Sequence, residues 1–420
     1  MNVAVIGSGI SGLSCAHYLS ERHEVSVFEA GSRLGGHTAT MDVKLGTRRY
    51  AIDTGFIVFN DWTYPNFIAL LEELGVSSRA TSMGFSVRDP ESGLEYSGAS
   101  LDTLFAQRRN LLSPGFLGMV RDILRFNKQA VADVEAGTLD PAETLGQYLT
   151  RNGYGQRFID HYLAPMGSAI WSSDCDSITA FPVEFFLRFF RNHGLLQVRD
   201  RPQWRVVEGG SREYIAPLTA RFQERVYVDS PVRLVRRQPG RGVTLVLASG
   251  EQRHFDQVVF ATHSDQALAL LEAPTDAERD ILGAIPYQAN DVVLHTDRRM
   301  LPRDPKTWSS WNYTLGEKDR PAVVTYNMNI LQGIQAPETF CVTLNDTASI
   351  NPRRILGRFR YDHPVFSLPG MAAQERWEEI NGVADTWYCG AYWHNGFHED
   401  GVVSALRVAA AMGESVRIAA

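Results

Sequence analysis

Three glycines near the start of the chain have the spacing of a phosphate-binding loop. Gly7, Gly9 and Gly12 form a G-x-G-x-x-G pattern directly after the apolar run 3–6. The first glycine permits a tight turn, the second lets backbone approach a pyrophosphate, and the third lets a helix pack closely on a strand. Glu29 ends the next apolar run, where a carboxylate can bind the hydroxyls of a ribose. Together these residues predict a dinucleotide-binding βαβ unit.

The stretch that follows distinguishes between dinucleotides. Arg33, Gly35 and Gly36 make an R-x-G-G pattern just after the predicted ribose-binding acid. Arginine offers phosphate a rigid fork of donors, and paired glycines let backbone come close to a bulky cofactor. The segment resembles the second fingerprint of the flavin amine oxidase and phytoene desaturase superfamily, where these residues line the phosphate and ribityl chain of FAD. The resemblance implies FAD, bound non-covalently because no cysteine stands where monoamine oxidases attach their flavin.

The stretch 388–406, YCGAYWHNGFHEDGVVSAL, gathers aromatic, histidine and acidic residues ahead of a predicted helix. In the superfamily the last βα turn runs under the isoalloxazine ring, and a helix N-terminus there favours the negative charge of the reduced ring. The resemblance places Gly401 and Val402 at the ring and Gly390 at the cofactor. It places His398 where amine oxidases carry a tyrosine of their aromatic cage, so His398 is the candidate base or orienting group. The residues expected to line the substrate pocket are Phe56, Tyr392, Trp393 and Phe397.

Three further positions bear on the resemblance. Val232 matches the valine whose backbone contacts the adenine in the superfamily. Ala391 departs from the pattern, because family members commonly carry an acidic residue there. Lys306 is the candidate for the lysine that many amine oxidases hold near flavin N5, although its register does not match the family's.

The elements that must position these residues form a discontinuous plan in the α/β class. Residues 1–60, 205–280 and 380–420 are expected to form a Rossmann-like, glutathione-reductase-like FAD-binding domain. Residues 61–204 and 281–379 are expected to form an inserted α+β, amine-oxidase-like substrate domain. Its first part is mainly helical by pattern, and its second part mixes strands with helices.

Composition excludes several classes of function. A net charge of −7 over 420 residues argues against a nucleic-acid partner, which needs a concentrated basic face. The four cysteines are far apart, and no spacing typical of metal ligands occurs. No apolar run approaches the ~20 residues of a membrane-spanning helix, and no signal peptide is evident. We therefore expect a cytoplasmic protein without a metal site, and we leave its oligomeric state open.

Two segments allow a peripheral contact with a membrane. The phenylalanine-rich segment 181–196 is either a core helix or an apolar surface for lipid. The cations of the preceding region either attract anionic headgroups or form an ordinary solvated face. These cations are Arg108, Arg109, Arg121, Arg125 and Lys128.

The reaction that fits these residues is transfer of a hydride from a substrate carbon to flavin N5. The sequence resembles bacterial amine-oxidase-like flavoproteins associated with fatty acid and carotenoid-type desaturation, with GGHTAT, DTGF and GFHEDG carrying the likeness. Dehydrogenation of a lipid or fatty acyl chain is therefore the first hypothesis. Amine oxidation is the alternative, and a non-catalytic flavin-binding redox protein is the second alternative.

Overall fold

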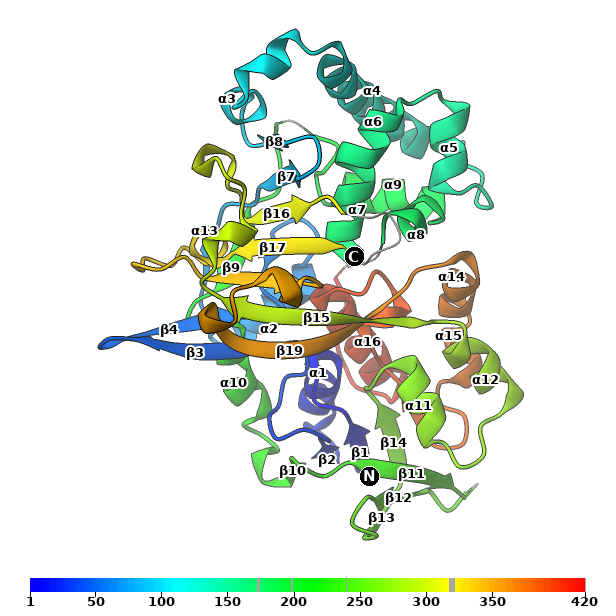
Figure 1. Ribbon diagram of the computed structural model, residues 1–420. Helices are drawn as coiled ribbons and strands as arrows, with labels where there is room; N and C mark the ends of the chain where they lie inside the picture. The colour runs from blue at the N-terminus through cyan, green and yellow to red at the C-terminus, as the bar shows by residue number, and fades with distance from the viewer. Residues whose placement is uncertain (172–173, 198, 239, 317–321, 420) are drawn as a thin grey trace.

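A parallel sheet brings together the start, the middle and the end of the chain (Figure 1). The structure is a computed structural model that describes residues 1–171, 174–197, 199–238, 240–316 and 322–419. The sheet has the order β10-β2-β1-β14-β20. Its strands are β1 (Asn2–Ile6), β2 (Glu24–Phe28), β10 (Val226–Tyr227), β14 (Gln257–Phe260) and β20 (Thr386–Tyr388). The central strands β1 and β14 are apolar and buried, as expected where helices cover both faces of a parallel sheet.

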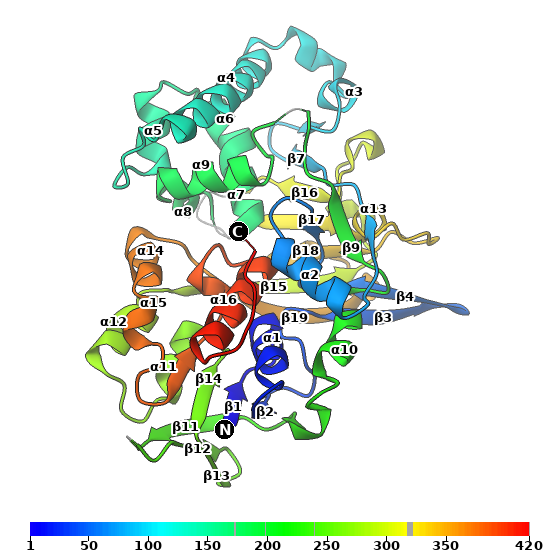
Figure 2. The same cartoon turned by 180° about the vertical axis from the view of Figure 1, so that it is seen from behind.

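Two helices from opposite ends of the chain lie side by side near this sheet (Figure 2). They are α1 (Ile10–Leu19) and α16 (His398–Ala411). Their close approach depends on Gly401, because a Cβ there would lie 2.7 Å from Ile10 Cγ2 and 2.9 Å from Ser11 Oγ. A larger residue at Gly401 would separate the helices.

A second, seven-stranded sheet has the order β19-β15-β18-β17-β16-β7-β8. Its pairs are antiparallel except for the parallel pair β16–β7. The strands are β7 (Phe85–Asp89), β8 (Leu94–Ser97), β15 (Tyr287–His295), β16 (Trp311–Thr314), β17 (Val323–Asn327), β18 (Cys341–Leu344) and β19 (Ile355–Pro364). In Figure 1 this sheet lies between the parallel sheet below and a group of helices above.

The upper group of helices comes from the middle of the first half of the chain (Figure 1). Its members are α3 (Leu101–Leu104), α4 (Pro114–Ala136), α5 (Leu145–Arg151), α6 (Gln156–Phe158), α7 (Ala164–Trp171), α8 (Cys175–Thr179) and α9 (Val183–Asn192). The four phenylalanines of α9, at positions 185, 186, 189 and 190, are all buried. The core-helix interpretation of this segment is therefore confirmed, because these side chains are not on the outer surface of the protein.

The remaining elements connect the two sheets or flank them. The strands are β3 (Thr40–Leu45), β4 (Arg48–Asp53), β5 (Phe59–Asn60), β6 (Ser78–Ala80), β9 (Trp204–Val207), β11 (Val232–Arg237), β12 (Val243–Leu247) and β13 (Gln252–Phe255). The helices are α2 (Pro65–Glu73), α10 (Ile215–Thr219), α11 (Ser264–Leu270), α12 (Asp276–Gly283), α13 (Met328–Leu331), α14 (Leu368–Glu375) and α15 (Trp377–Ile380). Over the described ranges, none of the helices combines the length and apolarity needed to span a bilayer.

Candidate functional site

A cavity of about 750 Å³ runs from the first glycine loop to the start of α16. Its wall includes segments of both sheets, so residues far apart in the sequence face the same space. The predicted site residues that line it are Gly7, Gly9, Glu29, Gly35, Gly36, Phe56, Val232, Gly390, Tyr392, Phe397 and His398. The predicted residues outside this wall are Gly12, Arg33, Trp393, Gly401 and Val402.

The first glycine loop has the geometry that its spacing predicts. Gly7 has φ +102°, and a Cβ there would lie 2.7 Å from the carbonyl oxygen of Ala261. A Cβ on Gly12 would collide with the carbonyl of Gly7 and lie 2.9 Å from Ala261 Cβ, so this glycine lets α1 pack against the strands. Gly9 begins α1 without a side-chain cap, and a Cβ on Gly9 would meet nothing within 4 Å. The open space beside an uncapped helix N-terminus suits an anion.

The two glycine segments contact each other directly. Gly35 donates its backbone N–H to the carbonyl of Ser8 at 2.9 Å, and a Cβ on Gly36 would lie 3.2 Å from Gly9 Cα. The guanidinium of Arg33 is turned into its own loop, where it donates to the carbonyl oxygens of Gly36 at 2.8 Å and Thr38 at 3.0 Å. Arg33 therefore holds the shape of the second loop in this structure rather than lining the cavity.

Glu29 stands at the glycine-loop end of the cavity and ties its loops together. One carboxylate oxygen accepts from the backbone N–H of Ser8 at 3.1 Å and from its hydroxyl at 2.5 Å. The other accepts from the N–H of Gly31 at 2.7 Å. Val232, at the start of β11, lines the same cavity. A carboxylate held in this way is preorganised to accept hydrogen bonds from a ribose.

His398 lies at the far end of the cavity, where its ring stacks on Phe56 with 3.4 Å between centroids. Its Nε2 lies 3.1 Å from the hydroxyl of Thr38 and 3.0 Å from the hydroxyl of Tyr214. These two hydroxyls also bond to each other. Burial lowers the pKa of His398 to about 3. The imidazole is therefore neutral at ordinary pH, and it is a weak proton acceptor with one nitrogen already engaged.

Helix α16 begins at His398, three residues before the glycine that the resemblance places at the ring. Asp400 accepts the backbone N–H of Phe397 at 2.8 Å, so the first turn starts at His398. Phe397 and His398 line the cavity, whereas Gly401 packs against α1 and Val402 is fully buried in the core. This placement differs from the expectation that Gly401 and Val402 face the ring, because the carboxylate cap fixes the helix start three residues before Gly401.

The aromatic residues before α16 divide into a cavity wall and a core. Tyr392 and Phe397 line the cavity, and the ring of Phe397 stacks on Phe189 of α9 at 5.2 Å. Trp393 is 1% exposed and belongs to the apolar core instead. Gly390 lines the cavity and donates its N–H to the hydroxyl of Ser404 in α16 at 3.0 Å.

Three histidines that were not among the predicted site residues meet at the cavity wall. The ring of His37 lies 5.3 Å from that of His363 and 6.1 Å from that of His263. Burial lowers the pKa of each, for His363 to about 4, so all three are neutral. The signal for His37 was its position next to Gly36. His363 lies near the end of β19, and no local pattern marks it as close to His37.

Lys306 lies elsewhere. Its ammonium pairs with the exposed Asp102 at 2.6 Å, and it is absent from the described wall of the cavity. The expectation of a lysine near flavin N5 is thus not met by Lys306. Within the described residues, no group of three or more potential ligands is arranged to hold a metal ion.

The cavity fits an elongated dinucleotide in two respects that do not depend on resemblance. The space beside Gly9 and the uncapped N-terminus of α1 can take a pyrophosphate. Nε2 of His37 is buried without a hydrogen-bond partner among the described residues, so this part of the wall has unused hydrogen-bonding capacity. Residues that would hold FAD are the glycine loops, Glu29 and the first turn of α16.

Comparisons with known proteins agree with this fit. A model of the flavin containing amine oxidoreductase family matches residues 10–330. The 15-cis-phytoene desaturase of Synechococcus elongatus is 38% identical over 80 residues, which are 19% of this chain and 16% of that protein. The matched segment therefore spans only a small part of that relative.

Solved structures share the fold over nearly the whole chain. Cyclohexylamine oxidase from Brevibacterium oxydans has a TM-score of 0.70 at 17% identity, with 98% of both chains covered. A CLA-producing fatty acid isomerase from P. acnes has a TM-score of 0.71 at 15% identity over the same shares. A putative protoporphyrinogen oxidase from Exiguobacterium has a TM-score of 0.67 at 17% identity, again over 98% of both chains. The predicted fold class is confirmed. Because the family model extends from α1 over most of the sequence, the chain belongs to the flavin-containing amine oxidoreductase family, and it is an FAD-dependent oxidoreductase.

Proposed function

We propose that the enzyme dehydrogenates an apolar, chain-like substrate such as a lipid or fatty acyl chain. The observation that carries this proposal is the composition of the cavity wall around and beyond Phe56. Its side chains are aromatic or aliphatic, and the described lining contains no lysine or arginine. These wall residues are Ile57, Val58, Ile170, Trp171, Trp311, Tyr326, Leu331, Phe366 and Phe397. Such a surface binds hydrocarbon by excluding water.

The charged groups of the described wall are few. Glu29 and Asp362 are the carboxylates among the described lining residues, and Glu29 is bonded to Ser8 at the glycine-loop end. His37, His363 and His398 are neutral because burial lowers their pKa. A neutral, water-poor wall favours a substrate without charge at its reacting carbons.

When bound, FAD would supply the oxidant for this reaction: a hydride from one carbon and a proton from its neighbour would convert FAD to FADH2 and leave a double bond in the chain. The protein binds the chain in the apolar wall and keeps water out. The first turn of α16 starts at His398, which lines the cavity, so the positive end of the helix dipole stabilises negative charge there. Nε2 of His37 has no hydrogen-bond partner in the part of the chain that the structure describes, so His37 is better placed than His398 to exchange a hydrogen bond with a bound molecule.

The names of two similar proteins, a phytoene desaturase and a fatty acid isomerase, support this substrate class. Amine oxidation is the second candidate, because Asp362 in the wall offers a carboxylate for an ammonium group and a cyclohexylamine oxidase shares the fold. The two candidates differ in whether Asp362 matters for the reaction.

The test is anaerobic mixing of the yellow holoprotein with acyl lipids and, separately, with primary amines, while the visible absorbance of the flavin is followed. We expect bleaching by acyl chains and an unchanged rate in Asp362→Asn. Bleaching by amines alone, slowed in Asp362→Asn, would replace the proposal with amine oxidation. Failure of every donor to bleach the flavin would favour a non-catalytic flavoprotein.

A further inference from the structure

Exposed leucines gather on one part of the upper group of helices. Twelve large apolar side chains are exposed in the described part of the chain, and five of these lie within residues 101–124. Leu112 is 88% exposed and Leu101 is 77% exposed. We call these five leucines and the cations among them the leucine–arginine surface. Its members are Leu101, Leu111, Leu112, Leu117, Leu124, Arg108, Arg109, Arg121, Arg125 and Lys128.

Helix α4 shows why these leucines face outward. Its inner face buries residues such as Phe116, Met119 and Phe126. The spacing i, i+4, i+7, i+11 places Leu117, Arg121, Leu124 and Lys128 along its outer face. Outer positions of a surface helix are normally polar, yet half of this row is leucine. The apolar side chains are therefore not a by-product of core packing.

The charge of this surface is opposite to that of the whole protein. Residues 101–128 carry five cations against two carboxylates, a net charge of +3, whereas the chain carries −7. Both carboxylates are already engaged. Asp102 pairs with Arg108 at 2.5 Å, and the buried Asp122 accepts the N–H of Gly155 at 3.0 Å and lies 3.5 Å from both Arg121 and Arg125. The surface therefore attracts anions while most of the molecule repels them.

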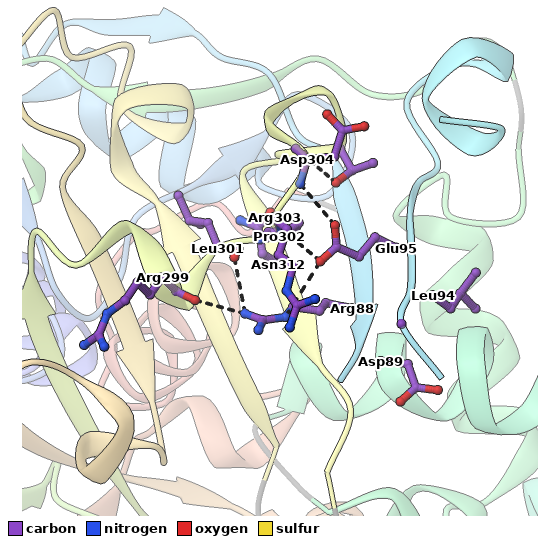
Figure 3. Close-up of polar contacts among 12 residues, drawn as sticks. Arg88, Asp89, Leu94, Glu95, Arg299, Leu301, Pro302, Arg303, Asp304 and Asn312 are labelled. Carbon is purple, nitrogen blue, oxygen red and sulfur yellow. Dashed lines mark hydrogen bonds and ion pairs between the residues drawn. The ribbon is translucent and has the colours of Figure 1, made fainter. Parts of the chain in front are cut away.

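Next to this surface, strands β7 and β8 are tied to the segment 299–304 (Figure 3). Arg88 on β7 donates to the carbonyl oxygens of Arg299 at 2.9 Å and Leu301 at 3.3 Å. Glu95 on β8 accepts from the backbone N–H groups of Arg303 at 2.9 Å and Asp304 at 3.1 Å. Since β8 leads directly into α3, these contacts fix the base of the surface. Its leucines are presented on an ordered platform.

We propose that the leucine–arginine surface seats the protein on an anionic lipid bilayer. The leucines enter the headgroup–acyl boundary and the cations contact phosphates, the combination by which amphipathic helices lie on membranes. The exposed apolar members are leucines, which seldom carry the binding energy between proteins and are among the residues that interfacial helices bury in a membrane. This composition favours a bilayer over a protein partner.

The test is flotation of the holoprotein with phosphatidylcholine vesicles, prepared with and without phosphatidylglycerol. We expect binding to the vesicles with phosphatidylglycerol, weakened by salt because screening removes the attraction. The double variant Leu112→Ser/Leu124→Ser should lower the partition coefficient at least about tenfold, since two inserted side chains are lost. The variant Arg109→Ser/Arg121→Ser should lower it on anionic vesicles by a comparable factor.

The matched control is Leu356→Ser/Leu368→Ser, which removes two exposed leucines of β19 and α14, outside this surface. It should bind like the parent, and flavin absorbance and circular dichroism should show that every variant is folded. Binding unaffected by loss of Leu112 and Leu124, or no binding to anionic vesicles at low salt, would overturn the proposal. The proposal would also be overturned if the parent formed a dimer without lipid and Leu112→Ser/Leu124→Ser converted this dimer to a monomer. The flotation assay does not measure turnover, so its result does not depend on whether the enzyme oxidises lipids.

Discussion

The ring of His398 lies parallel to the ring of Phe56, with 3.4 Å between centroids and 11° between planes. Phe67 meets the same imidazole edge-on at 5.6 Å. Phe56 thus covers one face of the imidazole, while Phe67 packs against both His398 and Tyr214. The site uses a fixed, neutral imidazole to hold Phe56 and two hydroxyl groups in place at the cavity wall.

Replacing His398 by alanine should slow flavin reduction by substrate about tenfold while FAD stays bound, because small misplacement of wall groups costs rate rather than cofactor affinity. His398→Gln should recover part of the rate, since an amide can still bond to Thr38 and Tyr214. Because burial lowers the pKa of His398 to about 3, its charge does not change near neutrality. Between pH 5 and 8, the parent and His398→Gln should therefore show the same dependence of the reduction rate on pH. Stopped-flow absorbance measures these rates, and an unchanged rate in His398→Ala would remove this residue from the site.

The glycines of the first loop give a prediction that separates folding from cofactor binding. A Cβ on Gly9 meets no protein atom within 4 Å, so Gly9→Ala should fold with a Tm close to that of the parent when both are stripped of FAD. The added methyl group would occupy the space assigned to the pyrophosphate, and FAD affinity should fall at least about tenfold. Gly12→Val should lose both FAD and stability, because its side chain collides with the Gly7 carbonyl. Titration of apoprotein with FAD, monitored by fluorescence, checks both. Normal affinity in Gly9→Ala would show that the pyrophosphate lies elsewhere.

Glu29→Ala should weaken FAD binding by about ten- to a hundredfold, the range expected when hydrogen bonds to a charged acceptor are lost. Part of this effect comes from the loops, since Glu29 also holds Ser8 and Gly31. Riboflavin 5′-phosphate lacks the adenosine ribose and serves as the control ligand. If the variant weakens binding of FAD and riboflavin 5′-phosphate equally, Glu29 acts only on loop shape.

The sequence predicted the glycine loops well because their requirements are local. Gly7 needs a positive φ and Gly12 needs the absence of a Cβ, and both follow from spacing alone. The start of α16 was harder to predict. It is set by the hydrogen bond from the Phe397 N–H to the Asp400 carboxylate, whereas the resemblance drew attention to Gly401. The histidine cluster could not be predicted because it depends on long-range contacts. His363 lies on β19, whose position is set by its pairing with β15, and no local pattern shows that this brings it next to His37.

The cap of α16 gives a prediction about pH. Burial raises the pKa of Asp400 from its ordinary value near 3.8 to about 7. The folded state binds this proton more tightly than the unfolded state does. The contribution of Asp400 to the free energy of unfolding is therefore fully present below about pH 4 and is lost as pH rises through 7. At pH 8 the folded protein must hold a buried carboxylate in its charged form. Asp400→Asn keeps an oxygen that can accept the Phe397 N–H and removes that charge.

We therefore expect Asp400→Asn to be more stable than the parent at pH 8, by up to ~4 kcal/mol, with the difference shrinking as pH falls towards 4. Asp53, whose pKa burial raises to about 6, titrates in both proteins and cancels from the difference. Urea unfolding at pH 5 and pH 8 measures the two values. The control is Asp265→Asn, an exposed acid in the first turn of α11, which should change stability by a similar small amount at both pH values. A difference between Asp400→Asn and parent that is equal at both pH values would contradict the assignment, because a proton taken up by Asp400 on folding makes this difference vary with pH.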